Sequence, residues 1–309
     1  MKRVVDRIQW HRKQWAHRRL AAGVLKARPI VPADDGVIYF SMIGTRVLLP
    51  YLVSIKSLWH QVPRGRVVIL DDGTLTDADR KLLAYHLGDP EIRAIAAVDT
   101  GECPRGGTWE RLLTILDLRA DAYVIQVDSD TVTVGPLPEV AAAIDAGRSF
   151  TLKGEAASQI LPLATIAAQA IESQRFTNPA AHVQGAIESG MDRLDLPELA
   201  APAYVRGCSG FAGFAPSGEG RRIAEAFSRE ATALLGAERW AQWGSEQVTS
   251  NFVIANQPDP LLLPYDRYIN FWNEGVPEDA RFIHFIGTHR FTGGAYADAT
   301  RRAVAMLPR

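Results

Sequence analysis

Two carboxylates follow an apolar stretch near the middle of the chain. The apolar run over residues 124–127 leads directly into Asp128-Ser129-Asp130. In extended backbone, residues two apart point to the same side, so Asp128 and Asp130 face one direction. Ligands of open α/β sheets gather at the carboxyl ends of strands, and carboxylate oxygens are ligands that Mg²⁺ or Mn²⁺ takes. The pattern predicts a divalent metal site shared with substrate phosphates, and the alternative is a polar turn that closes the strand.

A histidine in a second apolar stretch could complete such a site. His284 lies in the stretch over residues 281–286, and Gly287 and Arg290 follow it. An imidazole beside two carboxylates suits Mn²⁺, and a guanidinium could neutralise a diphosphate. A lone histidine in a strand is also commonly a core or surface residue, so both interpretations stay open.

Two further stretches carry small and polar residues near predicted element ends. Small residues over 207–210 lead into a strand, and Glu246 and Gln247 open a helix that continues to Asn251. An acid at a helix N-terminus is favourable without any function, whereas the Gln247 amide could contact a sugar. The sequence has no Walker phosphate loop, no nucleophile elbow and no His-Glu-x-x-His helix. The catalytic mechanisms that depend on these motifs are therefore excluded.

Alternation of strand and helix patterns gives the fold class. Thr76 with Asp79 three residues later predicts a helix N-terminus, and the apolar run over 123–127 predicts a central strand buried on both faces. The alternation predicts an α/β fold with a mainly parallel central sheet flanked by helices. The predicted strands are 37–41, 66–70, 92–98, 123–127, 149–153, 211–215 and 281–286, and the predicted helices are 2–27, 47–60, 76–87, 109–118, 137–146, 160–173, 219–235 and 245–255.

The N-terminal segment is strongly basic although the chain is nearly neutral. The net charge of the 309 residues is −1. Residues 1–28 hold nine Lys or Arg and one acid, a charge of +8 that leaves −9 for the rest. Because a nucleic-acid binder carries positive charge on its folded body, no nucleic-acid partner is expected. The basic helix packs on the body or a second subunit, or it contacts an anionic membrane surface, and both interpretations stay open.

The composition is that of an ordinary globular protein, with 47% hydrophobic and 22% charged residues. It excludes disordered, collagen-like and coiled-coil classes. Cys103 and Cys208 are too few for a disulfide framework, and no apolar run resembles a membrane span or secretion signal. We expect a cytoplasmic protein, with peripheral attachment at the inner membrane face as the alternative. The expected domains are a basic helical extension over 1–30 and one domain over 31–309, in which residues 155–205 break the strand–helix rhythm.

The order of these pieces over residues 36–292 resembles the GT-A glycosyltransferases, and most closely the retaining enzymes of family 8. Asp128 and Asp130 match that family's metal motif, and His284 followed by Gly287 matches its third metal ligand. Arg290 stands at its diphosphate-binding lysine. The resemblance implies a GT-A fold and a Mn²⁺- or Mg²⁺-dependent transfer of a hexose from a nucleotide-diphosphate sugar, a UDP-sugar, to an acceptor hydroxyl with retention.

The resemblance also implies roles for single residues. The implied metal ligands are Asp128, Asp130 and His284; the implied donor-binding residues are Arg111, Asp128, Ser129, Asp130, Gly287 and Arg290; the implied catalytic residues beside the sugar are Glu246 and Gln247. The chain departs from the family at three places. Residues 42–47 replace a nucleobase turn, Cys208 replaces an asparagine, and Glu246 replaces an aspartate.

Two other functions share this sheet and metal motif. A sugar-phosphate nucleotidyltransferase carries a Gly-rich basic loop after its first strand, of which residues 44–46 are a poor version. A non-catalytic sugar-nucleotide-binding protein is permitted by the changed turn and by Cys208, although the retained metal motif argues against it. The acceptor stays open among glycans, lipid-linked glycans and small molecules, as does the oligomeric state. Residues 155–205 are expected on the acceptor side.

Overall fold

The computed structural model describes residues 2–173, 182–287 and 289–309. The chain forms two compact units, each discontinuous in sequence. The first unit consists of Met1–Ile95, Ile125–Ala141 and Pro264–Arg309, and the second unit of Ala96–Val124 and Ala142–Leu263.

Parallel strands form the sheet of the first unit. These are β1 (Val37–Ile43), β2 (Arg66–Asp71), β3 (Glu91–Ala94) and the unit's part of β4 (Tyr123–Val127), in the order β4-β1-β2-β3. β1 pairs in parallel with β2, and β2 with β3. The chain runs outward from β1 to β3 and then returns to the other side of β1 with β4. The carboxyl ends of β1 and β4 therefore flank a topological switch point, where ligands of such sheets bind.

A second, smaller sheet of the first unit carries part of the site. Its strands are β5 (Thr131–Thr133), β11 (Tyr268–Asn270) and β12 (Phe282–His284), in the order β11-β12-β5. β12 is antiparallel to β5, with His284 opposite Thr131, and parallel to β11, with His284 opposite Asn270. This register brings His284 back to the chain segment that directly follows β4.

The helices α2 (Leu48–Gln61) and α3 (Asp77–Leu87) follow β1 and β2 in the first unit. The predicted start of α3 is confirmed, because the Thr76 hydroxyl accepts from the Asp79 backbone N–H at 3.2 Å and the Asp79 carboxylate accepts from the Thr76 N–H at 2.9 Å. This reciprocal pair satisfies two backbone donors that a helix N-terminus otherwise leaves without partners.

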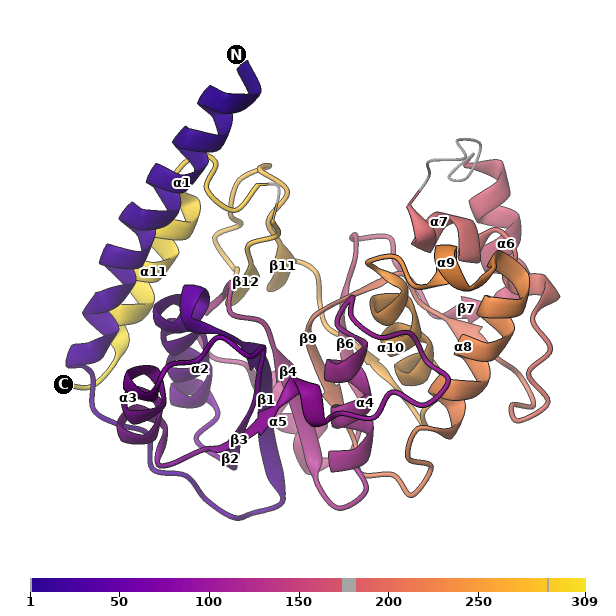
Figure 1. The fold of residues 1–309 in the computed structure, drawn as a ribbon, viewed down its shortest axis with the longest axis horizontal. Coiled ribbons are helices and arrows are strands. Elements are labelled where there is room, and N and C mark those ends of the chain that lie inside the picture. The colour runs from indigo at the N-terminus through magenta and orange to yellow at the C-terminus, as the bar shows by residue number, and fades with distance from the viewer. Residues whose placement is uncertain (1, 174–181, 288) are drawn as a thin grey trace. The chain divides into compact units, whose positions relative to one another are not determined.

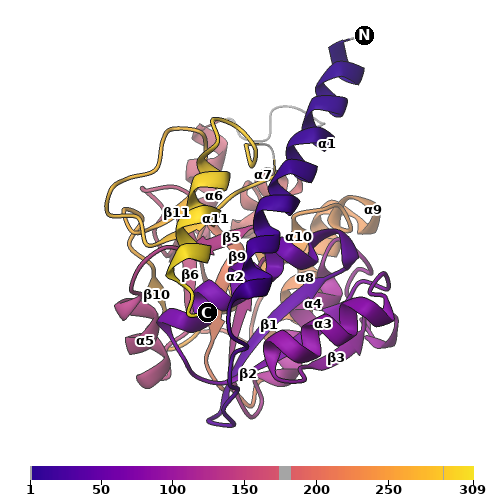
Figure 2. The same cartoon turned by 90° about the vertical axis from the view of Figure 1, so that its left-hand side faces the viewer.

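The basic N-terminal segment is the helix α1 (Lys2–Ala21), continued by a 3₁₀ turn over Ala22–Lys26. It lies beside α11 (Ala295–Met306), as Figures 1 and 2 show from two sides. Trp10 meets the ring of Phe291 edge-on at 5.5 Å, and His17 hydrogen-bonds Thr300 at 2.9 Å. The interpretation that this helix packs on the body is confirmed.

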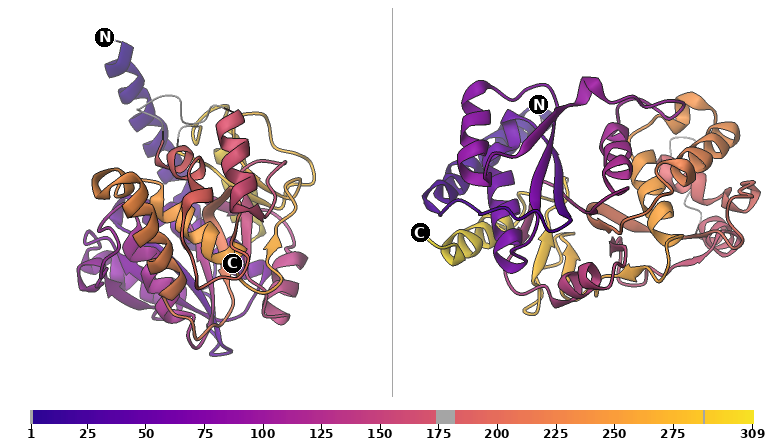
Figure 3. Two further views of the ribbon diagram at one scale, coloured as in Figure 1. Left: turned by 90° about the vertical axis from the view of Figure 1, so that its right-hand side faces the viewer. Right: turned by 90° about the horizontal axis from the view of Figure 1, so that it is seen from below.

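The second unit holds β6 (Phe150–Lys153), β9 (Gly207–Phe214) and β10 (Leu261–Leu262) in the order β10-β6-β9. It also holds a short pair, β7 (Leu161–Pro162) with β8 (Ala203–Tyr204). β10 is parallel to β6, and β6 is antiparallel to β9. Figure 3 gives two further views of the ribbon, the right-hand one from below. One helix, α5 (Pro138–Asp145), begins in the first unit and ends in the second. The other helices of the second unit are α4 (Trp109–Leu118), α6 (Leu163–Glu172), α7 (Val183–Glu188), α8 (Arg222–Leu235), α9 (Ala237–Trp240) and α10 (Ser245–Ala255).

The predicted α/β fold with a mainly parallel sheet flanked by helices is confirmed, and several element bounds need correction. α6 begins at Leu163 rather than residue 160, because Leu161–Pro162 form β7, and β12 ends at His284 rather than residue 286. β3 ends at Ala94 rather than residue 98, because residues 95–97 form a 3₁₀ turn. β9 begins at Gly207 rather than 211, because its small residues pair with β6. α8 begins at Arg222 rather than 219. In the described ranges, no helix combines the length and apolar character that crossing a membrane requires.

Candidate metal centre and active site

Asp128, Asp130 and His284 lie together in the first unit. Each offers one ligand atom, and these atoms all lie within 4.8 Å of one another. Asp130 and His284 are buried, while Asp128 is half-buried. The two carboxylates directly follow the carboxyl end of β4, and the pairing of β12 with β5 supplies the imidazole. Two hard oxygen donors and one nitrogen in this space fit a divalent cation such as Mn²⁺.

The backbone that carries Asp128 is fixed by two hydroxyl groups. Ser54 Oγ of α2 donates to the Asp128 carbonyl at 2.9 Å, and Thr131 Oγ1 donates to the same carbonyl at 3.0 Å. The two hydroxyl oxygens also lie 2.6 Å from each other, so their two protons are shared among these three contacts. Ser54 of α2 therefore holds the turn after β4 in place, so that the carboxylates of Asp128 and Asp130 are positioned before any ion binds.

His284 is oriented by an asparagine that the sequence analysis missed. Its Nδ1 donates to Asn270 Oδ1 of β11 at 2.9 Å, which leaves the lone pair on Nε2. Nε2 lies 3.5 Å from Asp130 Oδ1. Metal-binding histidines commonly give their second ring N–H to such a partner, which fixes the tautomer. Asn270, which orients the ligand His284, therefore also has the role that a metal site requires.

Arg290 joins the same cluster. Its Nη2 donates to Asp130 Oδ2, and its Nε donates to the Phe285 carbonyl at 3.1 Å. Burial acts to raise the pKa of Asp130, but His284 in its protonated form and the Arg290 guanidinium outweigh it and hold the pKa below its ordinary value. Asp130 is therefore an anion at neutral pH, ready to bind a cation.

The segment around Ser129 and Arg290 rests on α1. The Tyr296 hydroxyl donates to the Ser129 carbonyl at 3.5 Å, and His17 stacks on the Tyr296 ring at 3.7 Å. Burial, and secondly the charge of Arg290, lowers the pKa of His17 to about 4, so that this imidazole is neutral at pH 7. Gly287 is exposed, with open space beside its Cα.

The turn after β1 packs on the turn after β2. A Cβ atom on Gly44 would lie 2.1 Å from Asp72 Oδ1, so a larger residue there would displace the side chains of Asp72 and Thr74. Asp72 Oδ1 accepts from the Thr74 hydroxyl at 2.6 Å. Thr45 Oγ1 lies 2.5 Å from Thr74 O and 2.6 Å from Asp79 Oδ2, and its single proton is shared between these two acceptors. Threonines and aspartates thus occupy the strand end where the resemblance predicts nucleobase contacts.

Arg111, Glu246 and Gln247 lie in the second unit. Arg111 and Glu246 form a buried ion pair at 2.9 Å. Arg111 also donates to Ser209 Oγ at 3.1 Å, and the Thr108 hydroxyl donates to Glu246 at 2.9 Å. Each charge neutralises the other. Both side chains can therefore be buried near the N-terminal ends of α4 and α10, where the dielectric constant is low.

Behind Gln247 lies a polar cluster in the stretch that broke the predicted rhythm. The Gln247 side-chain oxygen accepts from the Ser209 N–H at 3.3 Å, and its amide nitrogen is 3.5 Å from Gln184 Oε1. Gln184 donates to Glu188 at 3.0 Å. Glu188 also accepts from Tyr204 at 3.2 Å and from Arg206. Gln184 and Glu188 lie on α7, which the sequence analysis did not predict because this short helix follows an irregular stretch.

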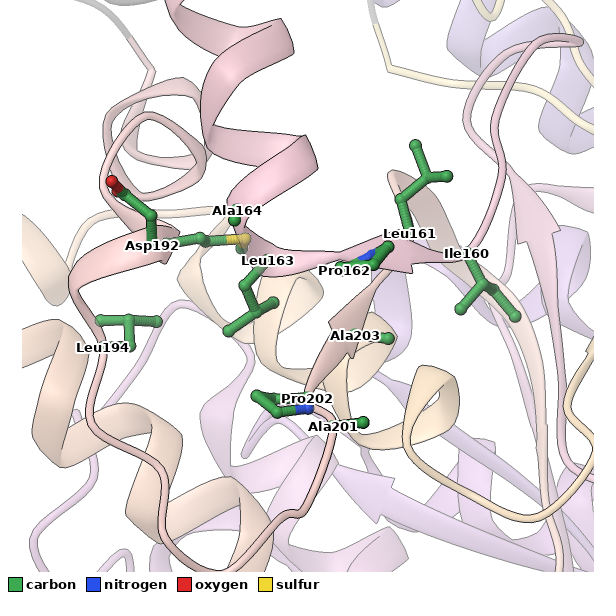
Figure 4. A pocket seen from close by; sticks show the side chains of 11 residues that line it. Ile160, Leu161, Pro162, Leu163, Ala164, Asp192, Leu194, Ala201, Pro202 and Ala203 are labelled. Carbon is green, nitrogen blue, oxygen red and sulfur yellow. The ribbon is translucent and has the colours of Figure 1, made fainter.

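A pocket of about 350 Å³ also lies in residues 155–205, within the second unit. Figure 4 shows its lining, which comes from residues 160–164, 191, 192, 194 and 201–203. Asp192 is the one charged side chain of this lining, and the other lining side chains are apolar. Sugar hydroxyls need several hydrogen-bonding groups, so this pocket does not have the chemistry of a sugar site.

Comparison with known proteins bears on the fold. No protein-family model matches the sequence, and no curated protein does. The bifunctional glycosyltransferase WbbM, in its apo form, is similar with a TM-score of 0.52 and 14% identity, over 91% of this chain and 51% of that chain. An active-site mutant of LgtC is similar with a TM-score of 0.50 and 11% identity, over 88% of this chain and 96% of that chain. The chain has the GT-A fold.

The GT-A fold agrees with the placement of the metal centre. This chain spans about half the length of the WbbM chain and nearly all of the LgtC chain. At these identities the likeness concerns the fold. The likeness bears on function in one respect. The cluster of Asp128, Asp130 and His284 follows the carboxyl end of β4, where ligands of such sheets bind.

Proposed function

We propose that this protein is a metal-dependent glycosyltransferase, which moves a hexose from a nucleotide-diphosphate sugar to an acceptor hydroxyl. The observation that carries the proposal is the cluster of Asp128, Asp130, His284 and Arg290 at the carboxyl end of β4. The two carboxylates suit a cation, and the adjacent guanidinium suits the diphosphate that the cation would share. The GT-A fold of the chain and the names of WbbM and LgtC support the same reaction class.

The first unit would hold the donor diphosphate. A divalent cation, with Mn²⁺ favoured by the imidazole ligand, would stabilise the negative charge that develops on the departing diphosphate. Asp128, Asp130 and His284 would hold that ion, while Asn270 keeps the lone pair of His284 on Nε2. The ligands are preorganised, because hydroxyls and backbone bonds already fix the turn that carries them.

Arg290 would act on the leaving group directly. A guanidinium has five N–H donors, and the contacts with Asp130 and Phe285 hold it in place through two of its nitrogens. Further N–H groups can then donate to phosphate oxygens. Hydrogen bonds between charged groups are the stronger ones, and their effect grows as charge develops in the transition state.

The second unit would contact the sugar. Following the family resemblance, we assign Gln247 to the hexose and Glu246 to its neighbourhood, with an oxocarbenium-like transition state. Gln247 is half-buried, whereas Glu246 is 1% exposed and bonded to Arg111. The exposure favours Gln247 as the group that touches the sugar and Glu246 as the anchor of Arg111. Retention, family 8 membership and a UDP-sugar donor belong to the same proposal.

The acceptor side is proposed within residues 155–205 and the strand that follows. Arg206 is half-buried, and Glu188 behind it is buried and accepts from it. Such a guanidinium, held in place by a buried carboxylate, offers further N–H donors to a sugar hydroxyl. Gln184 is hydrogen-bonded both to Glu188 and to Gln247. The residues that contact the acceptor and the sugar would therefore share one hydrogen-bond network.

A screen of donor hydrolysis tests the proposal. The protein is incubated with single UDP-hexoses and GDP-hexoses, with Mn²⁺ or with a chelator, and free hexose and nucleotide are measured. The proposal expects Mn²⁺-dependent release of hexose and nucleoside diphosphate from one donor. Release of sugar phosphate and nucleoside triphosphate after addition of pyrophosphate would instead identify a nucleotidyltransferase. Binding of a donor without any turnover, even with acceptors added, would identify a non-catalytic binding protein.

A further inference from the structure

α1 presents one packed and one exposed face. Its packed face carries His17 and Ala21, which are buried against the rest of the first unit. Arg12 and Arg19 lie on the other side and are exposed. Lys13 is exposed too, although it lies one turn before His17 on the packed side. The helix also continues beyond α11 at its N-terminal end (Figures 1 and 2). The exposed face of α1 is therefore available to a partner.

The exposed basic residues are not neutralised within the unit. Arg12, Lys13 and Arg19 form no ion pair with any side chain that the structure describes. Arg18 differs, because it lies near enough to Asp79 to act on that carboxyl. Burial raises the pKa of Asp79, but hydrogen bonds from Thr45 and Thr76, helped by the charge of Arg18, outweigh it and lower the pKa. Three exposed cations of α1, two of them on one face, are thus available to an anionic partner.

A large aromatic side chain lies among these cations. Trp15 is 60% exposed, and the Arg19 guanidinium lies 4.6 Å above its ring. Exposing tryptophan on a helix is unfavourable in water unless the ring is buried in a complex. Tryptophan beside arginine is typical of helices that lie in the headgroup region of a bilayer, where the ring is buried and the cation meets phosphate.

We propose that the exposed face of α1, defined by Arg12, Trp15 and Arg19 and flanked by the exposed Lys13, docks on the surface of an anionic lipid bilayer. Nucleic acid is the less favoured polyanion, because all residues after 28 together carry −9 and would oppose wrapping by a long phosphate chain. A bilayer needs only the one helix to approach it. Each basic residue near an anionic surface strengthens binding roughly fivefold, so these three cations contribute about 100-fold.

The docked helix is joined to the candidate metal centre within the same unit. His17 stacks on Tyr296, whose hydroxyl reaches the Ser129 carbonyl between the two metal-binding aspartates. Docking would therefore hold the donor side at the membrane surface. Among the acceptor classes this favours a lipid-linked glycan, and this last step alone rests on the proposed function.

Co-sedimentation of the full chain with vesicles tests the docking, independently of any catalytic activity. The vesicles consist of phosphatidylcholine alone or of phosphatidylcholine with phosphatidylglycerol, at low and high salt. We expect binding that requires phosphatidylglycerol and is lost at high salt, because salt screens exposed charges. The variant Arg12→Gln/Lys13→Gln/Arg19→Gln, which keeps good helix formers, should bind about 100-fold more weakly.

The control variant Lys81→Gln/Arg222→Gln/Arg229→Gln lowers the net charge equally at exposed positions on α3 and α8. It should bind like the wild type. Trp15→Ala should weaken binding further, whereas Trp272→Ala, at another exposed tryptophan, should not. Docking by this face is contradicted by equal binding to neutral vesicles, by no binding to anionic ones, by equal weakening in the control, or by tighter binding to an RNA oligonucleotide.

Discussion

Replacing Asn270 by leucine removes the hydrogen-bond acceptor of His284 while nearly keeping the volume of the side chain. Asn270 Oδ1 lies 2.9 Å from His284 Nδ1, and both residues are buried. In the variant, the Nδ1–H of the same tautomer has no acceptor at this place. The imidazole then rotates or changes tautomer, and either change moves the lone pair away from the metal site.

Two magnitudes follow from this geometry. A buried donor left without its partner costs about 1–3 kcal/mol of unfolding free energy, which urea unfolding without metal measures. Removing the residue that orients a metal-binding histidine weakens metal affinity by roughly 10- to 100-fold. Asn270→Asp keeps an acceptor at the same place, so we expect it to retain Mn²⁺ affinity within a few-fold of the wild type.

The assay is a calorimetric titration with Mn²⁺ in the presence of UDP. Asn256→Leu is the matched control, because Asn256 bonds the backbone of Ala203 in the second unit at 2.9 and 2.8 Å. It should lose stability and keep Mn²⁺ affinity. Unchanged Mn²⁺ affinity in a folded Asn270→Leu variant would refute the reasoning, since His284 would then need no orienting partner.

Three further outcomes follow from the same structure. His284→Ala should raise the Mn²⁺ concentration needed for half-maximal donor hydrolysis, and an identical metal titration would make His284 purely structural. Burial lowers the pKa of His17 from 6.5 to about 4, so on acidification the His17 imidazole is protonated in the unfolded chain before it is protonated in the folded one. The free energy of unfolding should therefore fall by about 2 kcal/mol from pH 7 to pH 5. Urea titrations of His17→Gln should lack this part of the fall. Glu246→Gln should cost about 3 kcal/mol in urea unfolding because it leaves the Arg111 charge buried, and Arg111→Met added to it should restore most of the loss.

Elements with strong local signals were predicted from the sequence. α4, α10 and β4 have the predicted bounds, because apolar periodicity or a continuous apolar run defines them over their whole length. The start of α3 was predicted because Thr76 and Asp79 form a capping box that depends on local residues alone. Such local interactions do not require knowledge of the tertiary fold.

Elements that depend on distant partners were missed or misplaced. β11 is only three residues long, and its pairing with β12 bridges residues far apart in the chain. Its residue Asn270 therefore carried no signal beyond being polar in a short apolar stretch. β9 began four residues early because glycine and serine, poor strand formers, pair there with β6. The helix α11 lies beyond the last element predicted.

The site divides in the same way. Asp128, Asp130, His284 and Arg290 were predicted from residue type and order, and the structure brings them together. The groups that orient them came from the tertiary fold. The mutual pairing of Arg111 with Glu246 also had no local signal, since 135 residues separate the two in sequence.

The central claim is that a divalent cation joins this chain to a nucleoside diphosphate. Calorimetric titration of the wild type and of Asp130→Asn with UDP and with GDP, each with and without Mn²⁺, tests it most directly, with urea unfolding as the control for folding. We expect tight binding of one nucleotide to the wild type only when Mn²⁺ is present, and loss of that binding in Asp130→Asn. Equal binding with and without Mn²⁺, or unchanged Mn²⁺-dependent binding in folded Asp130→Asn, would contradict it.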